Sequence, residues 1–235
     1  MKHITILHLH GFASSAQSTK AQFFRRKFES LPQVDFHAID FNPTPRDFEY
    51  MTVTGMIDRL RQYVLDRDLG TARVIGSSLG GLIGLNYAHR FGNQRFVGQR
   101  FGGVDKMLLL APALSWLSGG LTEGELGHWE KAGVAPVFHY AFEKETPLRY
   151  DLQVDGLRYL QPVPPPAPIL IVHGRDDDSV PIANSRKYAA EFPDRVQLIE
   201  VDADHDLNDH LPFIWDHARS FLLAEPHRRE TSGAG

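Results

Sequence analysis

The stretch R-V-I-G-S-S-L-G-G-L, residues 73–82, decides the fold. A short run of apolar and β-branched residues, typical of a buried strand, leads into small residues and then into helical spacing that continues to His89. Residues 76–80 fit the pattern G-x-S-x-G, in which small residues permit a strained turn between strand and helix. Such a turn lifts the hydroxyl of Ser78 clear of the sheet and points the amide of Leu79 at a developing negative charge. The alternative is that Ser78 only caps the helix.

Short apolar runs of the same kind recur along the chain and alternate with stretches of helical spacing. Strand candidates lie at residues 4–9, 34–41, 73–75, 107–110, 169–172 and 196–201, and helical spacing covers residues 24–31, 56–64 and 211–222. Strands that alternate with helices form parallel sheets covered by helices on both faces. We therefore predict an α/β fold with this architecture.

One segment, residues 113–160, interrupts the alternation. It contains Trp116 and Trp129, several glycines and scattered aromatic residues, and we find no clear strand in it. It ends in a proline-rich connector, residues 162–168, that is too stiff for a helix or a central strand. Because only about 70 residues follow, too few for an independent parallel-sheet domain, we predict one domain over residues 1–235 with residues 113–160 as an inserted cap. Residues 225–235 are polar and are expected to form a frayed tail.

The composition excludes several classes of protein. The chain has 235 residues, 42% of them hydrophobic, and no cysteine, which excludes disulfides, cysteine-bound metal sites and a thiolate nucleophile. The net charge of −4 comes from interspersed charges, so no basic surface for nucleic acid or an anionic membrane is expected. No apolar run has the length of a membrane helix or a signal peptide. We expect a soluble, cytoplasmic monomer or homodimer with no cofactor.

A serine nucleophile needs a histidine to take its proton and an acidic residue to orient that histidine. On a parallel sheet of this type the acid and then the histidine follow later strands. The strand at residues 169–172 leads to three consecutive aspartates, residues 176–178, and the strand at 196–201 leads to His205. The spacing leaves open which of the three aspartates contacts His205.

The turn after the first strand can supply a second backbone amide, besides that of Leu79, to the negative charge that develops during the reaction. Residues 10–12 read His-Gly-Phe, and Gly11 allows the backbone to come close to a bound carbonyl group, so that the amide of Phe12 can donate to it. We place His10, Trp116 and Trp129 in the substrate pocket, although packing within the cap explains the tryptophans equally well.

Four stretches together resemble the α/β-hydrolase family: H-G-F at 10–12, G-S-S-L-G at 76–80, H-G-R-D-D-D-S-V-P at 173–181 and D-A-D-H-D at 202–206. Within that family the chain is similar to small bacterial hydrolases of the YqiA/YcfP type, whose early turn is H-G-F-x-S-S. The resemblance implies a Ser78 nucleophile, a His205 base and, four residues after His173, an Asp177 acid. The family's antiparallel hairpin before the first parallel strand has no room here, so we expect a sheet of six strands.

The expected activity is hydrolysis of small carboxylic esters through an acyl-enzyme, with an acyl compound as the only partner. Thioesters and amides or peptides are alternatives for the same three residues. A metal-dependent hydrolase is a rival hypothesis, but it leaves Ser78 and the acidic loop unexplained. Its candidate ligands are His8, His10, Asp204, His205, Asp209 and His210. A non-catalytic binding protein is a second rival, since folds of this type also host binding functions.

Overall fold

A six-stranded parallel sheet forms the centre of the protein in a computed structural model that describes residues 3–92, 95–96, 99–100, 102–116 and 121–224. Its strands are β1 (Ile4–Leu9), β2 (Val34–Ile39), β3 (Ala72–Ser77), β6 (Val104–Leu110), β9 (Ile169–Gly174) and β10 (Val196–Val201). They lie in the order β10-β9-β6-β3-β1-β2, and each neighbouring pair is parallel. The predicted six-stranded sheet is confirmed, whereas the tail expected at residues 225–235 lies outside the described residues.

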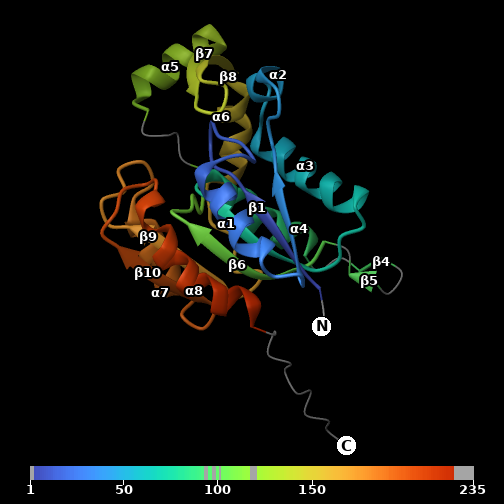
Figure 1. The fold of residues 1–235 in the computed structure, drawn as a ribbon. Coiled ribbons are helices and arrows are strands. Elements are labelled where there is room, and N and C mark those ends of the chain that lie inside the picture. Colours follow the sequence, from blue (N-terminus) through green and yellow to red (C-terminus); the bar gives the residue numbers. More distant parts are fainter. Residues whose placement is uncertain (1–2, 93–94, 97–98, 101, 117–120, 225–235) are drawn as a thin grey trace, which may run out of the picture.

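Helices cover both faces of the sheet (Figure 1). One face carries α1 (Thr19–Glu29) and α8 (Leu211–Leu223), and the other carries α3 (Val53–Asp66), α4 (Leu79–Phe91) and α7 (Ile182–Glu191). The helical spacing in the sequence explains this arrangement, because residues four apart share one helix face. Phe24 and Phe28 of α1, for example, are both fully buried against the sheet.

The segment between β6 and β9 leaves the sheet and forms the cap, residues 113–160, at one end of the molecule beside α2 (Pro45–Glu49) (Figure 1). The described part of the cap contains α5 (Glu123–Ala132), β7 (Val134–His139), β8 (Lys144–Arg149), α6 (Asp151–Gly156) and the 3-10 turn η1 (Leu157–Tyr159). Three further short elements lie elsewhere in the chain: β4 (Arg95–Phe96), β5 (Gln99–Arg100) and η2 (Asn208–His210).

The expectation that residues 113–160 contain no strand is wrong. Strands β7 and β8 pair as an antiparallel hairpin, in which Pro136 lies opposite Pro147. Proline lacks an amide hydrogen, so it weakens a strand prediction. In a two-stranded hairpin, however, every second amide points away from the partner strand, and a proline at such a position breaks no hydrogen bond.

The cap is fixed to α3 by a partly buried polar contact. The carboxylate of Asp155 accepts hydrogen bonds from the amide and the hydroxyl of Thr54, each at 2.7 Å. The hydroxyl of Tyr159 lies 2.7 Å from the same threonine hydroxyl, and the carbonyl oxygen of Tyr159 accepts from the amide of Trp116 at 2.7 Å. These bonds join the two ends of the cap to each other and to a helix of the main fold.

Candidate active site

Ser78 lies on a strained turn at the end of β3, immediately before α4. Its backbone has φ 51° and ψ −118°, a region that residues with a side chain rarely adopt. The turn packs so closely on β1 that a Cβ atom on Gly80 would lie 2.2 Å from the carbonyl oxygen of Leu9. Ser78 makes no side-chain cap to α4, so the interpretation of this serine as a simple helix cap is wrong. The strain instead presents its hydroxyl at the carboxyl end of the sheet.

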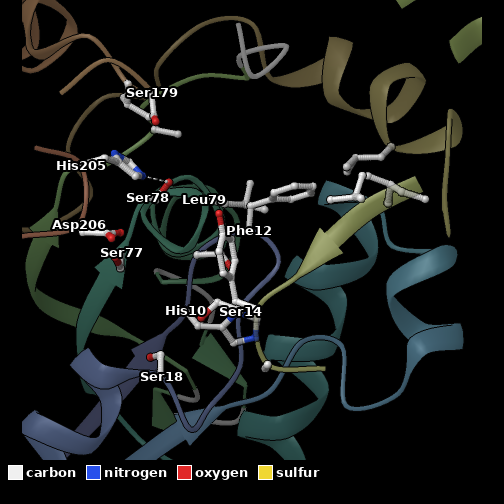
Figure 2. Close-up of a pocket in the computed structure, with 18 of the residues that line it drawn as sticks. His10, Phe12, Ser14, Ser18, Ser77, Ser78, Leu79, Ser179, His205 and Asp206 are labelled. Atoms are coloured by element: carbon white, nitrogen blue, oxygen red, sulfur yellow. Dashed lines mark hydrogen bonds between the residues drawn. The ribbon is translucent and has the colours of Figure 1, made fainter. Parts of the chain in front are cut away.

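The hydroxyl of Ser78 is the first member of a continuous chain of hydrogen bonds. Its Oγ lies 3.0 Å from Nε2 of His205 (Figure 2). Nδ1 of His205 in turn donates to Oδ2 of Asp177 at 2.7 Å. The Asp177 side chain is fully buried, whereas Asp176 and Asp178 are exposed at the rim of the cleft. The structure thus brings together the three residues that the family resemblance implied, and of the three consecutive aspartates Asp177 is the one that contacts His205.

Asp177 is held in place by a set of donors. Its Oδ1 accepts from the amides of Val180 at 2.7 Å and Ser179 at 3.0 Å. Its Oδ2 also accepts from Nε2 of the buried His173 at 3.0 Å, and Nδ1 of His173 accepts from the hydroxyl of Ser185 at 2.9 Å. The sequence predicted no role for His173 beyond marking the position of Asp177, and this contact was not predicted. The spacing H-x-x-x-D was the available signal, because it joins the strand end to the loop that carries the acid.

These contacts set the charge of Asp177. Burial raises the pKa of this carboxyl group, but hydrogen bonds from His173, His205 and the amide of Val180 outweigh burial and hold the pKa well below its usual range. The carboxylate therefore stays ionised throughout the neutral range. An ionised acceptor at Nδ1 fixes the tautomer of His205, leaves Nε2 free to take a proton, and stabilises the imidazolium that then forms.

The two expected amide donors lie beside Ser78 (Figure 2). Gly11 passes so close that a Cβ atom on it would lie 3.4 Å from Cβ of Ser78, and Leu79 follows Ser78 in the chain. Within the described residues, the amides of Phe12 and Leu79 donate to no protein acceptor. Two unpaired amides beside a nucleophile are the arrangement needed to stabilise a tetrahedral oxyanion.

His10 fixes the peptide group that carries one of these amides. Its Nδ1 donates to the carbonyl oxygen of Gly11 at 2.8 Å, and its Nε2 accepts from the amide of Phe41 at 3.0 Å. The amide hydrogen of Phe12 belongs to the same planar peptide group as that carbonyl oxygen, so the imidazole sets the direction of both. His10 lines the cleft, as expected of a pocket residue, but both of its ring nitrogens are already bonded within the protein.

A cleft of about 1680 Å³ lies above Ser78. The cap supplies an apolar wall, which includes the predicted Trp116 and Trp129. Both indole N–H groups bond within the cap, that of Trp116 to Gln153 at 2.8 Å and that of Trp129 to the carbonyl of Leu148 at 3.0 Å. The tryptophans therefore present only their apolar ring surfaces, which suits an apolar group of a substrate.

Two further findings concern metals and membranes. Among the described residues, no three histidine, aspartate or glutamate side chains are grouped so as to hold a metal ion, and His8, His10 and Asp209 form no such group. Within the same residues, each helix is too short or too polar to cross a bilayer.

Comparison with solved structures identifies the fold. A protein from Agrobacterium vitis S4 superposes with a TM-score of 0.76 at 20% identity, covering 94% of this chain and 88% of the other. The α/β hydrolase domain-containing protein 10 from mouse gives 0.69 at 20%, covering 92% and 90%. Est1E from Butyrivibrio proteoclasticus with bound ferulic acid gives 0.71 at 17%, covering 94% and 89%. At such identities the likeness establishes the α/β-hydrolase fold alone.

Sequence comparison identifies the family. None of the curated proteins compared with this chain matches it. The model of one protein family, described as Uncharacterised protein family UPF0227, matches residues 5–221, which is almost the whole of the described fold. The chain therefore belongs to the UPF0227 family and has the α/β-hydrolase fold.

Proposed function

We propose that the protein is a serine hydrolase that cleaves carboxylic esters through an acyl-enzyme intermediate. The observation that carries this proposal is the chain of contacts from Ser78 through His205 to Asp177, with distances of 3.0 and 2.7 Å. A base within hydrogen-bond distance of a hydroxyl, itself oriented by a buried carboxylate, is the arrangement that activates serine. The names of solved proteins with this fold, among them a mouse α/β hydrolase domain-containing protein and Est1E with ferulic acid, are consistent with hydrolysis.

In the first half of the reaction, Oγ of Ser78 attacks the ester carbonyl while Nε2 of His205 takes the hydroxyl proton. The carbonyl oxygen becomes an oxyanion that the amides of Phe12 and Leu79 stabilise. The C–O bond to the alcohol then breaks, and His205 gives its proton to the departing alcohol oxygen. In the second half, water attacks the acyl-enzyme with His205 again as base, and the carboxylic acid and free Ser78 are released. Asp177 remains ionised throughout.

A carboxylic ester demands less of this site than an amide does. Its alcohol leaves more readily than an amine, and the apolar cap wall can hold the acyl group. Thioesters and amides remain the alternatives for the same residues, and each predicts a different preference among test substrates.

The direct test compares Ser78→Ala with Ser220→Ala, a serine exposed on α8 far from the cleft. With p-nitrophenyl esters of increasing acyl length, we expect Ser78→Ala to lower kcat at least about a thousandfold with unchanged thermal unfolding, and Ser220→Ala to match the wild type. Mass spectrometry after treatment with a fluorophosphonate should place the adduct on Ser78. Near wild-type hydrolysis by Ser78→Ala would refute the mechanism.

The same enzyme should be offered acyl-CoA thioesters and aminoacyl naphthylamides. A value of kcat/KM for either class that exceeds the value for the best p-nitrophenyl ester would replace ester hydrolysis as the activity while leaving the serine mechanism in place.

A further inference from the structure

The cleft has two chemically different sides, which meet at Ser78. The cap side is mainly apolar, with Glu125, His128, Glu143 and Gln153 as its polar lining residues. The opposite side, here called the polar side, is formed by the turn after β1, the start of α1, the end of β3 and the loop after β10. Its side chains carry hydroxyl, amide or charged groups: Ser14, Ser15, Gln17, Ser18, Lys20, Ser77, Asp204, Asp206 and Asn208. Figure 2 shows Ser77, Asp206 and Ser18 on the side of the site that faces away from the cap hairpin.

The two sides correspond to the two faces of the sheet. Trp129 and Leu148 of the cap belong to the core that α3 and α4 share, whereas Leu207, in the loop after His205, belongs to the core beneath α1 and α8. Ser78 lies at the sheet end between these two cores. A substrate whose carbonyl carbon contacts Ser78 therefore extends from one side of the cleft to the other.

The position of His205 decides which part of an ester occupies which side. The departing alcohol oxygen must receive its proton from Nε2 of His205. His205 belongs to the same loop as Asp204 and Asp206, which line the polar side. The alcohol therefore leaves along the polar side, and the acyl group lies against the apolar cap wall, where burial of hydrocarbon is favourable.

The charges that line the cleft restrict the charge that the alcohol part of the ester can carry. Among the described residues that line it, Lys20 is the only lysine or arginine. Five carboxylates line the cleft outside the cap, those of Asp40, Asp176, Asp178, Asp204 and Asp206, and two more, Glu125 and Glu143, belong to the cap. Lys20 is half-buried and lines the cleft together with Asp206 and Asp204, whose negative charges act on its ammonium group and favour the charged form. An anionic alcohol part would therefore meet net repulsion without the set of cationic donors that phosphate binding uses.

The remaining choices are a cationic, an apolar or an uncharged polar alcohol. A cation would be repelled by the ammonium group of Lys20, which interacts electrostatically with the same two carboxylates, those of Asp206 and Asp204. An apolar alcohol would cover the hydroxyl groups of the polar side, such as that of Ser14, without pairing them, which is unfavourable. Only an uncharged alcohol with its own hydroxyl groups can pair with this lining.

We propose that the substrate is an ester of an apolar acyl group with an uncharged, hydroxyl-bearing alcohol of the polyol class, and that the polar side excludes phosphorylated alcohols. This inference rests on the proposed ester hydrolysis. It further disfavours acyl-CoA, whose leaving group carries several phosphates.

Three octanoate esters with the same three-carbon alcohol skeleton test the proposal: propyl octanoate, glycerol 1-octanoate and glycerol 1-octanoate 3-phosphate. Each is used below its aggregation concentration with the full chain. We expect kcat/KM for the glycerol ester to exceed that for the phosphorylated ester about tenfold at low salt, and the difference to shrink at 0.5 M NaCl because salt screens the carboxylates. The propyl ester should be cleaved less efficiently than the glycerol ester.

Variants that remove a negative charge and a variant that removes the positive charge should change the preference between the glycerol ester and the phosphorylated ester in opposite directions. The readout is the ratio of kcat/KM for the phosphorylated ester to that for the glycerol ester, because a general loss of activity cancels in it. Asp206→Asn and Asp204→Asn should each raise the ratio about threefold, and Lys20→Gln should lower it. Asp58→Asn, an exposed position on α3 outside the cleft, is the matched control and should leave the ratio unchanged.

Four results would each overturn the inference. The first three are a ratio of one or more in the wild type, a ratio that Asp204→Asn, Asp206→Asn and Lys20→Gln leave unmoved, and a propyl ester cleaved faster than the glycerol ester. Ser78-dependent cleavage of p-nitrophenyl esters with no cleavage of the glycerol ester would also overturn it, while the proposed function would stand. Loss of the proposed function would appear separately, as p-nitrophenyl ester hydrolysis that does not depend on Ser78.

Discussion

The amide of Tyr140, in the cap hairpin, donates a hydrogen bond to the carbonyl oxygen of Ala13 at 3.1 Å. Ala13 has a positive φ of 49° and directly follows Phe12, whose amide is one of the two expected oxyanion donors. An aromatic contact runs beside this bond, because Phe48 of α2 lies 5.6 Å from the ring of Phe12 and 4.7 Å from that of His139. The cap therefore supports the turn that carries Phe12, in addition to forming a wall of the cleft.

Removal of this single amide should reduce turnover. Tyr140→Pro deletes the N–H group, while Tyr140→Ala keeps it and removes only the ring, which is 73% exposed. Because the Phe12 amide acts in the transition state, we expect the proline variant to lower kcat about tenfold more than the alanine variant, with little change in KM. Steady-state kinetics with one p-nitrophenyl ester checks this. Equal kcat values for the two variants would show that the bond has no part in positioning the turn.

Substitution of each of the three consecutive aspartates by asparagine should have sharply different effects on kcat. Asp177→Asn removes the charge that stabilises the imidazolium of His205 and permits the wrong tautomer, so kcat should fall about a thousandfold or more. Asp176→Asn and Asp178→Asn change exposed rim carboxylates and should alter kcat less than about threefold. Single-turnover kinetics with a p-nitrophenyl ester separates acylation from later steps. If the Asp177 change were the mildest, the acid would be misassigned.

His173 should act through Asp177. His173→Leu leaves Oδ2 of Asp177 without one of its donors, so the carboxylate loses part of its orientation and its pKa rises toward the usual range. We expect kcat to fall about tenfold and the acid limb of the pH profile of kcat to move to higher pH. Ser185→Ala, which removes only the next hydroxyl in the chain, should have a smaller effect in the same direction. A loss of thermal stability with an unchanged pH profile would reduce His173 to a packing role.

His8 should make stability depend on pH. Its ring is fully buried between Phe24 and Phe36 with both nitrogens unpaired among the described residues. Burial lowers its pKa to about 3 from the ordinary value of 6.5. Between these values the unfolded chain binds a proton that the folded chain does not, so this residue costs stability progressively as pH falls below 6.5, by up to about 1.4 kcal/mol per pH unit.

His8→Leu should therefore flatten the pH dependence. Urea unfolding at pH 7, 6 and 5 should show that the free energy of unfolding falls less steeply in the variant than in the wild type. His89→Leu, at an exposed position on α4, is the control and should follow the wild type. Parallel curves for His8→Leu and the wild type would contradict the assignment.

Gly156 should control the shape of the apolar cap wall that is proposed to hold the acyl group. A Cβ atom at this position would lie 2.3 Å from the ring of Trp116, so Gly156→Ala must displace that indole. We expect a shift in acyl-length preference among p-nitrophenyl esters and a change in tryptophan fluorescence, with reaction of Ser78 toward a small fluorophosphonate retained. Gly127→Ala on α5 has open space around it and should leave the preference unchanged. An unaltered preference in Gly156→Ala would remove Trp116 from the pocket.

The sheet and the three central residues could be predicted because each leaves a local signal. Strand β3 is buried at all six positions, and apart from Arg73 its residues before the glycine that begins the turn are apolar. Parallel strands place their carboxyl ends at one edge, and loops that follow such strands therefore converge there. Ser78, Asp177 and His205 each follow a strand, which is why their order in the chain was sufficient to bring them together.

The cap hairpin and the supporting contacts could not be predicted for a different reason. Pro136 and Pro147 weaken the strand signal of β7 and β8 in the sequence, and these two strands pair with each other in a separate two-stranded sheet. The hydrogen bond from His173 to Asp177 depends on the rotamers of both side chains, which the sequence does not specify. The bond from Tyr140 to Ala13 joins two backbone groups 127 residues apart, and a backbone hydrogen bond requires no particular side chain at either residue. Such contacts become visible only when the chain is folded.

The strand order also has a consequence for biosynthesis. Along the chain from β1 through β3, β6, β9 and β10, each strand pairs with one that has already been made, and β2 pairs with β1 at the other edge. As the polypeptide leaves the ribosome, each new strand can therefore pair with a strand that was synthesised before it. After β2, every added strand extends the sheet at the same edge, the one that ends with β10. The nucleophile candidate emerges with the third strand of the sheet, the acid after the fifth, and the imidazole only after the sixth. A nascent chain therefore carries Ser78 in a largely formed sheet well before it has the base that could activate it, and a product that terminates early lacks that base altogether.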